Sequence, residues 1–283
     1  MTNRNVSLSQ ETKSILKEYG LTLNKKLGQN YLIDDFKLKK IIRFAKLNPN
    51  DTVLEIGCGI GTLSLEIAPL VKELIIIEKD SRNVKILNDR LKQLKIGNVE
   101  IITGDALTVD FPKFNKIVAN LPYQISSPLT FKFLEYDFDY AILMYQKEFA
   151  QRMIAKYDTK NYSRLSVMLH FKAQIEYLDT VSPQSFIPQP KVDSSIIKLT
   201  PKDNDEVDKF FETTTRALFQ HKKKNAKKAL KESFHEFGSY SKEEIKDILD
   251  SLSADNLDKK VFKLTPEEIL EISNNLKGLM KND

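Results

Sequence analysis

Short apolar runs alternate with amphipathic stretches between residues 50 and 145. Each run is four or five residues long and ends in turn residues, which is typical of strands buried on both faces of a parallel sheet. The predicted strands are Thr52–Ile56, Leu74–Ile77, Val99–Ile102, Lys116–Ala119 and Tyr140–Met144. The helix predicted over Asp80–Leu94 places on one face Val84, Leu87, Leu91 and Leu94. The alternation predicts an α/β fold with a doubly covered sheet.

Three further apolar segments are also predicted to be strands, and no clear helices lie between them. They are Leu165–Phe171, Glu176–Val181 and Ser195–Leu199. Because parallel strands need long crossover connections, we expect the last strands of the sheet to pair antiparallel.

A polar segment beginning at Pro201 interrupts this pattern. Beyond it the chain has helical periodicity, with predicted capping boxes at Ser241–Glu244 and Thr265–Glu268. Pro266 stands at the first position of the second of these helices, where proline is favoured. We therefore predict a domain boundary near residue 201 and a small all-helical domain over 202–283.

Composition narrows the class of protein. The 283 residues are 41% apolar and 29% charged, as in ordinary globular proteins. A single cysteine, Cys58, excludes an intrachain disulfide, and no two of the three histidines have the spacing of a metal pair. The longest apolar runs are far shorter than the ~20 residues of a membrane span. We expect a cytoplasmic monomer with neither a metal nor a membrane anchor.

Positive charge is concentrated in one stretch. The chain has a net charge of +5, whereas the stretch from Arg216 to Lys231 holds seven basic residues and no acid. Such asymmetry favours a polyanionic partner, although a solvated helix face rich in lysine has the same composition. The basic residues are Arg216, Lys222, Lys223, Lys224, Lys227, Lys228 and Lys231.

A glycine-rich turn follows the first strand, over Glu55–Gly61. Glycines allow a sharp turn and close approach to a ligand. Glu78, at the end of the second strand and twenty-one residues after Gly57, is placed to accept the hydroxyls of an adenosine ribose. Thr62 occupies the third glycine position of the dinucleotide fingerprint, which disfavours a nicotinamide enzyme. A purely structural turn remains an alternative.

Two further strand ends carry polar groups. Asp105 follows the third strand, where its carboxylate can accept the amine of an adenine. Asn120 and Leu121 follow the fourth, and their side-chain and backbone oxygens can accept both hydrogens of a target amine. A base stacked on Tyr123 would be held by ~1–3 kcal/mol. The alternative is a turn with Tyr123 in the core.

Five motifs occur together in one order: Lys26–Leu32, Glu55–Gly61, Gly104-Asp105, Asn120–Tyr123 and Phe186–Val192. With these motifs, and with Gln146–Arg152 and Tyr162–Ser166, the chain resembles the ribosomal RNA adenine dimethyltransferases that modify small-subunit RNA. The resemblance runs from about Asn24 to the C-terminus, and Leu143–Gln146 is closer to the archaeal and eukaryotic branch. Tyr31 and Cys58 depart from the commoner residues without removing a polar contact. Residues 1–23 lie outside it, as a disordered or branch-specific extension.

The resemblance implies a Rossmann-like class I methyltransferase domain over 24–201 and an RNA-binding domain over 202–283. It implies contacts to S-adenosylmethionine from Asn30, Leu32, Gly57, Glu78, Asp105 and Asn120. Asn120, Leu121 and Tyr123 would hold the target adenine, with Phe186 covering its other face. Members transfer two methyls to N6 of each of two adjacent adenosines near the 3′ end of small-subunit RNA, in a pre-ribosomal small subunit.

Binding of the RNA phosphates is predicted for the basic stretch and for two residues near the catalytic edge. These residues are Arg164, Lys191, Arg216, Lys222, Lys223, Lys224, Lys227 and Lys228. Three alternatives remain: a resistance-type enzyme that methylates large-subunit RNA, a non-catalytic assembly or transcription factor with the same fold, and a nicotinamide oxidoreductase. The motif over Phe186–Val192 favours the small-subunit reading, and the intact Asn120 and Tyr123 favour catalysis.

Overall fold

The structure is a computed structural model that describes residues 6–21, 30–203, 206–253 and 255–280. It divides into two compact units. The sheet unit comprises Met1–Ala150 and Ile175–Pro201, and the helical unit comprises Gln151–Gln174 and Lys202–Asp283. The segment Gln151–Gln174 therefore belongs with the C-terminal helices, which a single boundary at residue 201 does not anticipate.

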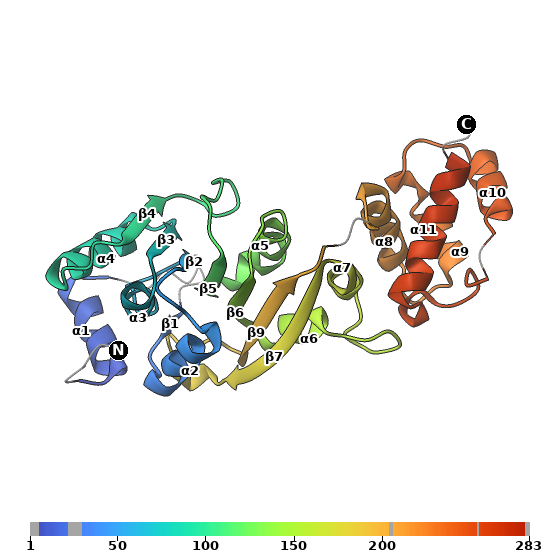
Figure 1. Cartoon of the computed structure of the whole chain (residues 1–283). Coiled ribbons are helices and arrows are strands. Elements are labelled where there is room, and N and C mark those ends of the chain that lie inside the picture. Colours follow the sequence, from blue (N-terminus) through green and yellow to red (C-terminus); the bar gives the residue numbers. More distant parts are fainter. Residues whose placement is uncertain (1–5, 22–29, 204–205, 254, 281–283) are drawn as a thin grey trace. The chain divides into compact units, whose positions relative to one another are not determined.

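A seven-stranded sheet forms the centre of the sheet unit (Figure 1). Its strands are β2 (Thr52–Ile56), β3 (Glu73–Glu78), β4 (Val99–Thr103), β5 (Lys116–Asn120), β6 (Tyr140–Gln146), β7 (Ala173–Val181) and β9 (Ser194–Pro201), in the order β4-β3-β2-β5-β6-β9-β7. The five predicted N-terminal strands are confirmed and pair in parallel, whereas β6 and β9 pair antiparallel. The order reverses between β2 and β5, and this topological switch point is where such sheets bind ligands.

Helices flank this sheet (Figure 1). They are α1 (Leu8–Glu18), α2 (Asp35–Ala45), α3 (Ser64–Ile67), α4 (Ser81–Gln93), α5 (Ser126–Phe133) and α6 (Lys147–Met153), with 3-10 turns η2 (Ala68–Leu70), η3 (Tyr123–Ile125) and η4 (Pro183–Ser185). A separate antiparallel pair joins β1 (Tyr31–Leu32) to β8 (Phe186–Ile187). The core packs Val53, Leu74 and Ile76 of the strands against Leu38 of α2 and Leu87 of α4.

Two expectations about these helices need correction. Helix α4 buries Asn83, Ile86, Leu87 and Leu91, while Leu94 is 48% exposed, so its inner face is rotated from the predicted one. The N-terminal extension includes an ordered helix, because Ser7 and Gln10 form a capping box on α1 and Leu8 and Ile15 are buried. Residues 1–5 and 22–29 lie outside the described residues, and they include the first four residues of the predicted motif Lys26–Leu32.

The helical unit contains α7 (Arg164–Lys172), α8 (Lys209–Gln220), α9 (Ala226–Glu232), α10 (Lys242–Ser251) and α11 (Pro266–Met280), with turns η5 (Phe234–Glu236) and η6 (Val261–Lys263). Both predicted capping boxes are present. The strand predicted over Leu165–Phe171 was wrong, since this run lies within α7, where most of its residues are buried. Within the part of the chain that the structure describes, no helix is long and apolar enough to cross a membrane.

Candidate functional site

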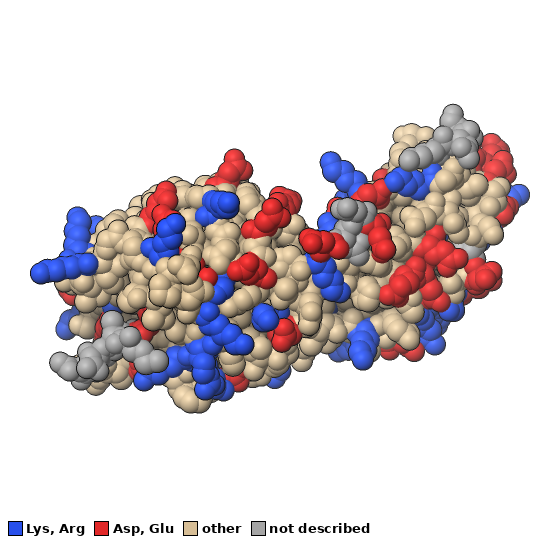
Figure 2. All heavy atoms as spheres, viewed as in Figure 1, with Lys and Arg blue, Asp and Glu red and all other residues tan. Residues whose placement is uncertain are grey.

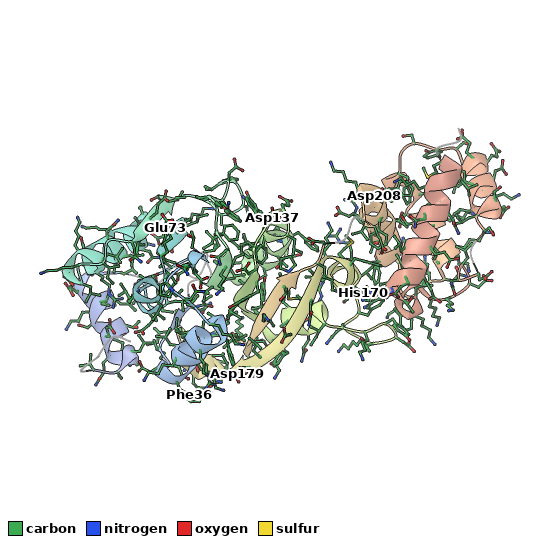
Figure 3. All side chains as sticks on the ribbon, in the orientation of Figure 1. Phe36, Glu73, Asp137, His170, Asp179 and Asp208 are labelled. Carbon is green, nitrogen blue, oxygen red and sulfur yellow. The ribbon has the colours of Figure 1, made fainter. Side chains whose placement is uncertain are left out.

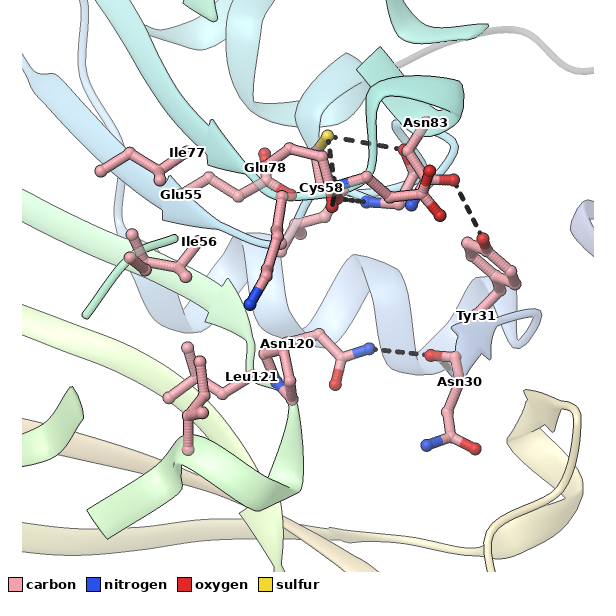
Figure 4. Close-up of a pocket in the computed structure, with 18 of the residues that line it drawn as sticks. Asn30, Tyr31, Glu55, Ile56, Cys58, Ile77, Glu78, Asn83, Asn120 and Leu121 are labelled. Carbon is pink, nitrogen blue, oxygen red and sulfur yellow. Dashed lines mark hydrogen bonds between the residues drawn. The ribbon is translucent and has the colours of Figure 1, made fainter. Parts of the chain in front are cut away.

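A cavity of about 290 Å³ opens at the carboxyl ends of β2, β3 and β5, beside the switch point of the sheet. Ligand sites in proteins begin at about this size. Five separate segments of the chain contribute to its lining, and Figure 4 shows the side chains of Asn30, Glu78 and Asn120 among them. The five segments are Asn30–Leu32, Glu55–Gly59, Ile77–Asp80, Gly104–Ala106 and Asn120–Ile125. Every cofactor-binding residue predicted from the sequence therefore lines one cavity.

The turn after β2 needs glycine for two reasons. Gly59 has φ +55°, and a Cβ added there would lie 2.6 Å from Cε1 of Tyr31. Gly61 has φ +87°, and its Cβ would lie 2.5 Å from Leu87 of α4. Such contacts are far shorter than van der Waals distances, so the turn is compressed between β1 and α4 and leaves backbone facing the cavity.

Glu78 holds this turn from the end of β3. Its Oε2 accepts a hydrogen bond from the backbone N–H of Gly59 at 3.0 Å, and its Oε1 accepts one from Asp80 N–H at 2.8 Å. Burial raises the pKa of the Glu78 carboxyl, and the two backbone hydrogen bonds act in the opposite direction. Oε2 also accepts a weak hydrogen bond from the Cys58 thiol at 3.7 Å, whereas Oε1 keeps a further lone pair, so the carboxylate can accept a hydroxyl of a ribose in the cavity.

Glu55 is a site residue to which the sequence analysis gave no role. Its side chain lines the cavity from β2, and burial raises its pKa to about 8. Its Oε2 is buried and has no hydrogen-bond partner within the described residues. A buried oxygen without a partner indicates a ligand that brings a positive charge or a donor. The available signal was a charged residue inside an otherwise apolar strand.

Asp105 lies at the rim of the cavity. Its Oδ2 accepts a hydrogen bond from Lys79 Nζ at 2.8 Å, which lowers the pKa of the carboxyl. Its Oδ1 accepts the N–H of Leu107, which fixes the side chain at the end of β4. On the opposite wall, Tyr31 donates from its hydroxyl to Oδ1 of Asn83 at 3.0 Å. Together these groups offer an ionised acceptor and an aromatic wall to a heterocyclic base.

The segment after β5 faces the glycine turn, with Asn120, Leu121 and Tyr123 all lining the cavity. Asn120 donates from Nδ2 to the backbone carbonyl of Asn30 at 3.2 Å. That bond leaves Oδ1 as the side-chain atom able to accept a hydrogen from a ligand amine. The hydroxyl of Tyr123 is 2.6 Å from Oγ of Ser194 on β9, which fixes the ring in one orientation.

Phe186 does not line the cavity. It is fully buried in β8, where it lies opposite Leu32 in the strand register. Leu32 is itself buried and contributes to the cavity wall. Phe186 therefore packs beside Leu32 of β1, and its contact with a target base stays a prediction.

Three of the seven basic residues in the basic stretch of the helical unit pair with acids that lie outside it in the sequence. Arg216 pairs with Glu236 at 3.0 Å and Lys227 with Asp250 at 2.8 Å. Lys224 pairs with Glu232, and Lys222 donates to the backbone carbonyls of Lys160 and Tyr162. Lys223 and Lys228 of the same stretch are exposed. The other two residues predicted to bind RNA, Arg164 at the start of α7 and Lys191 between β8 and β9, are exposed as well. The local charge is thus lower than the sequence predicts.

No group of three or more histidine, cysteine or acidic residues able to hold a metal ion occurs among residues 6–21, 30–203, 206–253 and 255–280. Cys58 lines the cavity, and burial raises the pKa of its thiol well above the ordinary value.

Comparison of the sequence with known proteins shows similarity to one protein family. The family model for ribosomal RNA adenine dimethylase matches residues 20–276. A probable ribosomal RNA small subunit methyltransferase A from Methanosphaera stadtmanae is 54% identical over 94% of this chain and 98% of that protein. One from Methanothermobacter thermautotrophicus is 50% identical over 96% and 97%.

Two solved structures are similar over most of the chain. A dimethyladenosine transferase from Plasmodium falciparum matches with a TM-score of 0.75 and 34% identity, over 88% of this chain and 98% of that one. The 23S rRNA methyltransferase ErmE matches with a TM-score of 0.62 and 27% identity, over 88% of this chain and all of that one. Both neighbours are methyltransferases, which confirms the fold class expected from the sequence.

Proposed function

The chain belongs to the ribosomal RNA adenine dimethylase family, and from this premise we propose that its cavity binds S-adenosylmethionine and presents the methyl group to N6 of an adenine in small-subunit ribosomal RNA. It is an enzyme, an RNA adenine dimethyltransferase. The observation that carries the assignment of the site is that Asn120, Leu121 and Tyr123 face the glycine turn and Glu78 across one cavity.

The residues present fit this cofactor. Glu78 would accept a ribose hydroxyl, Asp105 the adenine amine, and the turn at Gly57 would allow close approach of the methionine portion. The unpartnered buried oxygen of Glu55 fits a positively charged group on the ligand. When bound, S-adenosylmethionine supplies an electrophilic methyl on a sulfonium. Asn30 and Leu32 complete the wall on the side of β1.

The chain's own residues would then activate the amine by position. Asn120 Oδ1 and the Leu121 carbonyl would accept the two hydrogens of N6, which favours a pyramidal nitrogen with its lone pair directed at the methyl. Stacking on Tyr123 would fix the plane of the base. Catalysis of this kind depends on orientation and electrostatics and needs no covalent enzyme intermediate.

The substrate we propose is a partly assembled small subunit, with two adjacent adenosines near the 3′ end of its RNA as targets. The relatives that share about half of the sequence are named for the small subunit, which supports this over the large-subunit RNA of ErmE. We propose that the protein acts in the cytoplasm as a monomer. The domain over 24–201 would bind cofactor and target base, and the helices over 202–283 would bind RNA.

The test is methyl transfer from labelled S-adenosylmethionine to undermethylated small subunits, with the nucleosides identified by mass spectrometry. We expect N6,N6-dimethyladenosine from the wild type and its loss in Asn120→Ala. Asn88→Ala, an exposed asparagine on α4, is the matched control and should retain activity. Label in large subunits alone would replace the substrate, and tight subunit binding without label in either subunit would replace catalysis by an assembly role.

A further inference from the structure

Helix α2 presents an aromatic and basic face that the functions above leave without a role. Phe36, Lys39, Lys40 and Arg43 recur at intervals of three and four residues, so they form one stripe along the helix, called here the α2 stripe. Leu38, Ile41 and Ala45 occupy the opposite face and are buried in the core. Figure 2 shows basic side chains gathered over this helix.

Phe36 is the most unusual member of the stripe. It is 64% exposed, more than any other large apolar side chain in the described part of the chain. Figure 3 shows it projecting from α2 near Asp179. Lys40 Nζ lies 5.0 Å from the centre of its ring. An aromatic ring held in solvent beside a cation is the arrangement that single-stranded nucleic acids use for base stacking with phosphate contact.

The charge of the stripe is only partly compensated. Asp179 accepts from both Lys37 and Lys40 at 2.9 Å, so one carboxylate serves two ammonium groups. Asp35, the one acid within α2, accepts the backbone N–H of Leu8. Lys39 and Arg43 are exposed and form no ion pair with the described residues. The basic stretch of the helical unit, by contrast, has an acid for Arg216, Lys224 and Lys227.

The stripe also lies close to the cavity. Ile41, on the inner face of α2, contributes to the cavity wall, and Leu32 of the preceding strand does the same. The two faces of a helix are separated by its diameter, ~10–12 Å with side chains. Nucleotides that flank a target base in the cavity therefore come within reach of the stripe.

We propose that the α2 stripe is an RNA-docking surface of the sheet unit, with one unpaired base stacked on Phe36 and neighbouring phosphates bound by Lys39 and Arg43. This proposal rests on the proposed function, because it takes as ligand the unpaired ribosomal RNA next to the target adenosine. Charge complementarity and the exposed ring favour RNA over an acidic protein, which would offer no base to stack.

The full-length protein tests the proposal in two pairs of variants. Phe36→Ala is compared with Leu94→Ala, a 48% exposed apolar residue just beyond α4. Lys39→Gln/Arg43→Gln is compared with Lys85→Gln/Lys92→Gln, which removes two exposed charges from α4. For each we would measure the Kd for undermethylated small subunits at several salt concentrations, the KM and kcat of methyl transfer, and the Kd for S-adenosylmethionine.

We expect Phe36→Ala to weaken subunit binding about 5- to 150-fold, as loss of one stacked base predicts. The paired charge variant should lower the slope of log Kd against log salt by about one to two, as loss of two phosphate contacts predicts. KM should rise by similar factors, with kcat and cofactor affinity unchanged. Both control variants should behave as wild type.

The stripe proposal is overturned if its variants match their α4 controls in subunit affinity and KM. It is also overturned if they lose binding to vesicles of anionic lipid while subunit affinity stays intact. Absence of dimethyladenosine from the wild type would instead refute the proposed function, and the binding measurements would still decide whether the stripe contacts RNA.

Discussion

Replacing Glu78 by glutamine should weaken cofactor binding strongly while leaving the fold intact. Each oxygen of the carboxylate accepts one backbone N–H, from Gly59 at 3.0 Å and from Asp80 at 2.8 Å. A glutamine amide keeps one acceptor oxygen and turns an NH2 donor toward the other N–H. Toward the ligand, a charge-assisted hydrogen bond to a ribose hydroxyl is lost, worth ~1.5–3 kcal/mol, which corresponds to a Kd for S-adenosylmethionine raised ~10- to 150-fold. Burial of a neutral amide is less costly than burial of a carboxylate, so stability should change little.

Titration calorimetry measures this effect, with Glu73→Gln as the matched control at the opposite end of β3. Because Glu78 would act on the ribose and on the glycine turn, S-adenosylhomocysteine should lose affinity by the same factor as S-adenosylmethionine. The reasoning is refuted if Glu78→Gln binds either ligand within twofold of wild type. It is also refuted if only the sulfonium ligand loses affinity, since that result would place the carboxylate at the charged end of the cofactor.

Three further outcomes follow from contacts of the sheet unit. With a pKa of about 8, Glu55 is mostly protonated in the free protein at pH 7. A positively charged ligand favours the ionised carboxylate, so the affinity for S-adenosylmethionine should increase as the pH is raised towards 8, by up to ~tenfold per pH unit, and should level off above pH 8. Glu55→Gln should lack this increase, and parallel curves for the two proteins would contradict the prediction. Ser194→Ala removes the hydroxyl partner of Tyr123. We expect kcat/KM for small subunits to fall ~2- to 12-fold while the affinity for the cofactor stays unchanged. A matching fall in cofactor affinity would argue against a role of Ser194 in positioning Tyr123. Asp51→Ala leaves the buried ammonium of Lys116 without the carboxylate that lies 2.8 Å away, and it should destabilise the sheet unit by ~3–5 kcal/mol. Urea unfolding measures the loss by tyrosine fluorescence, because the chain has no tryptophan. A loss below ~1 kcal/mol would show that the ion pair is not effectively buried.

The strands and the positions of the cofactor residues could be predicted because one physical rule governs both. Apolar runs of β2, β3, β4 and β5 must lie parallel to be covered by helices, and parallel strands end at one edge. Glu78, Asp105 and Asn120 therefore meet there regardless of how the rest of the chain folds. The run Leu165–Phe171, which lies within α7, could not be assigned in this way, because a short apolar run buried on most sides has no period that separates helix from strand.

The site residues that sequence reasoning missed depend on which way a side chain faces. Glu55 is a charge in an apolar strand, but only the structure shows that the residue lines a cavity and that its buried Oε2 has no hydrogen-bond partner among the described residues. Phe186 stands in a loop-like motif rich in proline, yet β8 pairs with β1 and buries it. In both cases the local sequence is compatible with either orientation, and long-range packing decides.

Electrostatic predictions fail for a related reason, since charge is compensated in three dimensions and not along the chain. The stretch that includes Arg216, Lys224 and Lys227 has no acid of its own, but tertiary packing supplies Glu236, Glu232 and Asp250. In helix α2, Lys37 and Lys40 share Asp179, whereas Lys39 and Arg43 form no ion pair with the described residues. Affinity for RNA and its salt dependence arise when basic side chains release counterions from the phosphates, and a lysine already paired with a carboxylate contributes less to both. The sheet unit should therefore add a salt-dependent contribution to binding that the lysine-rich sequence of the helical unit does not predict.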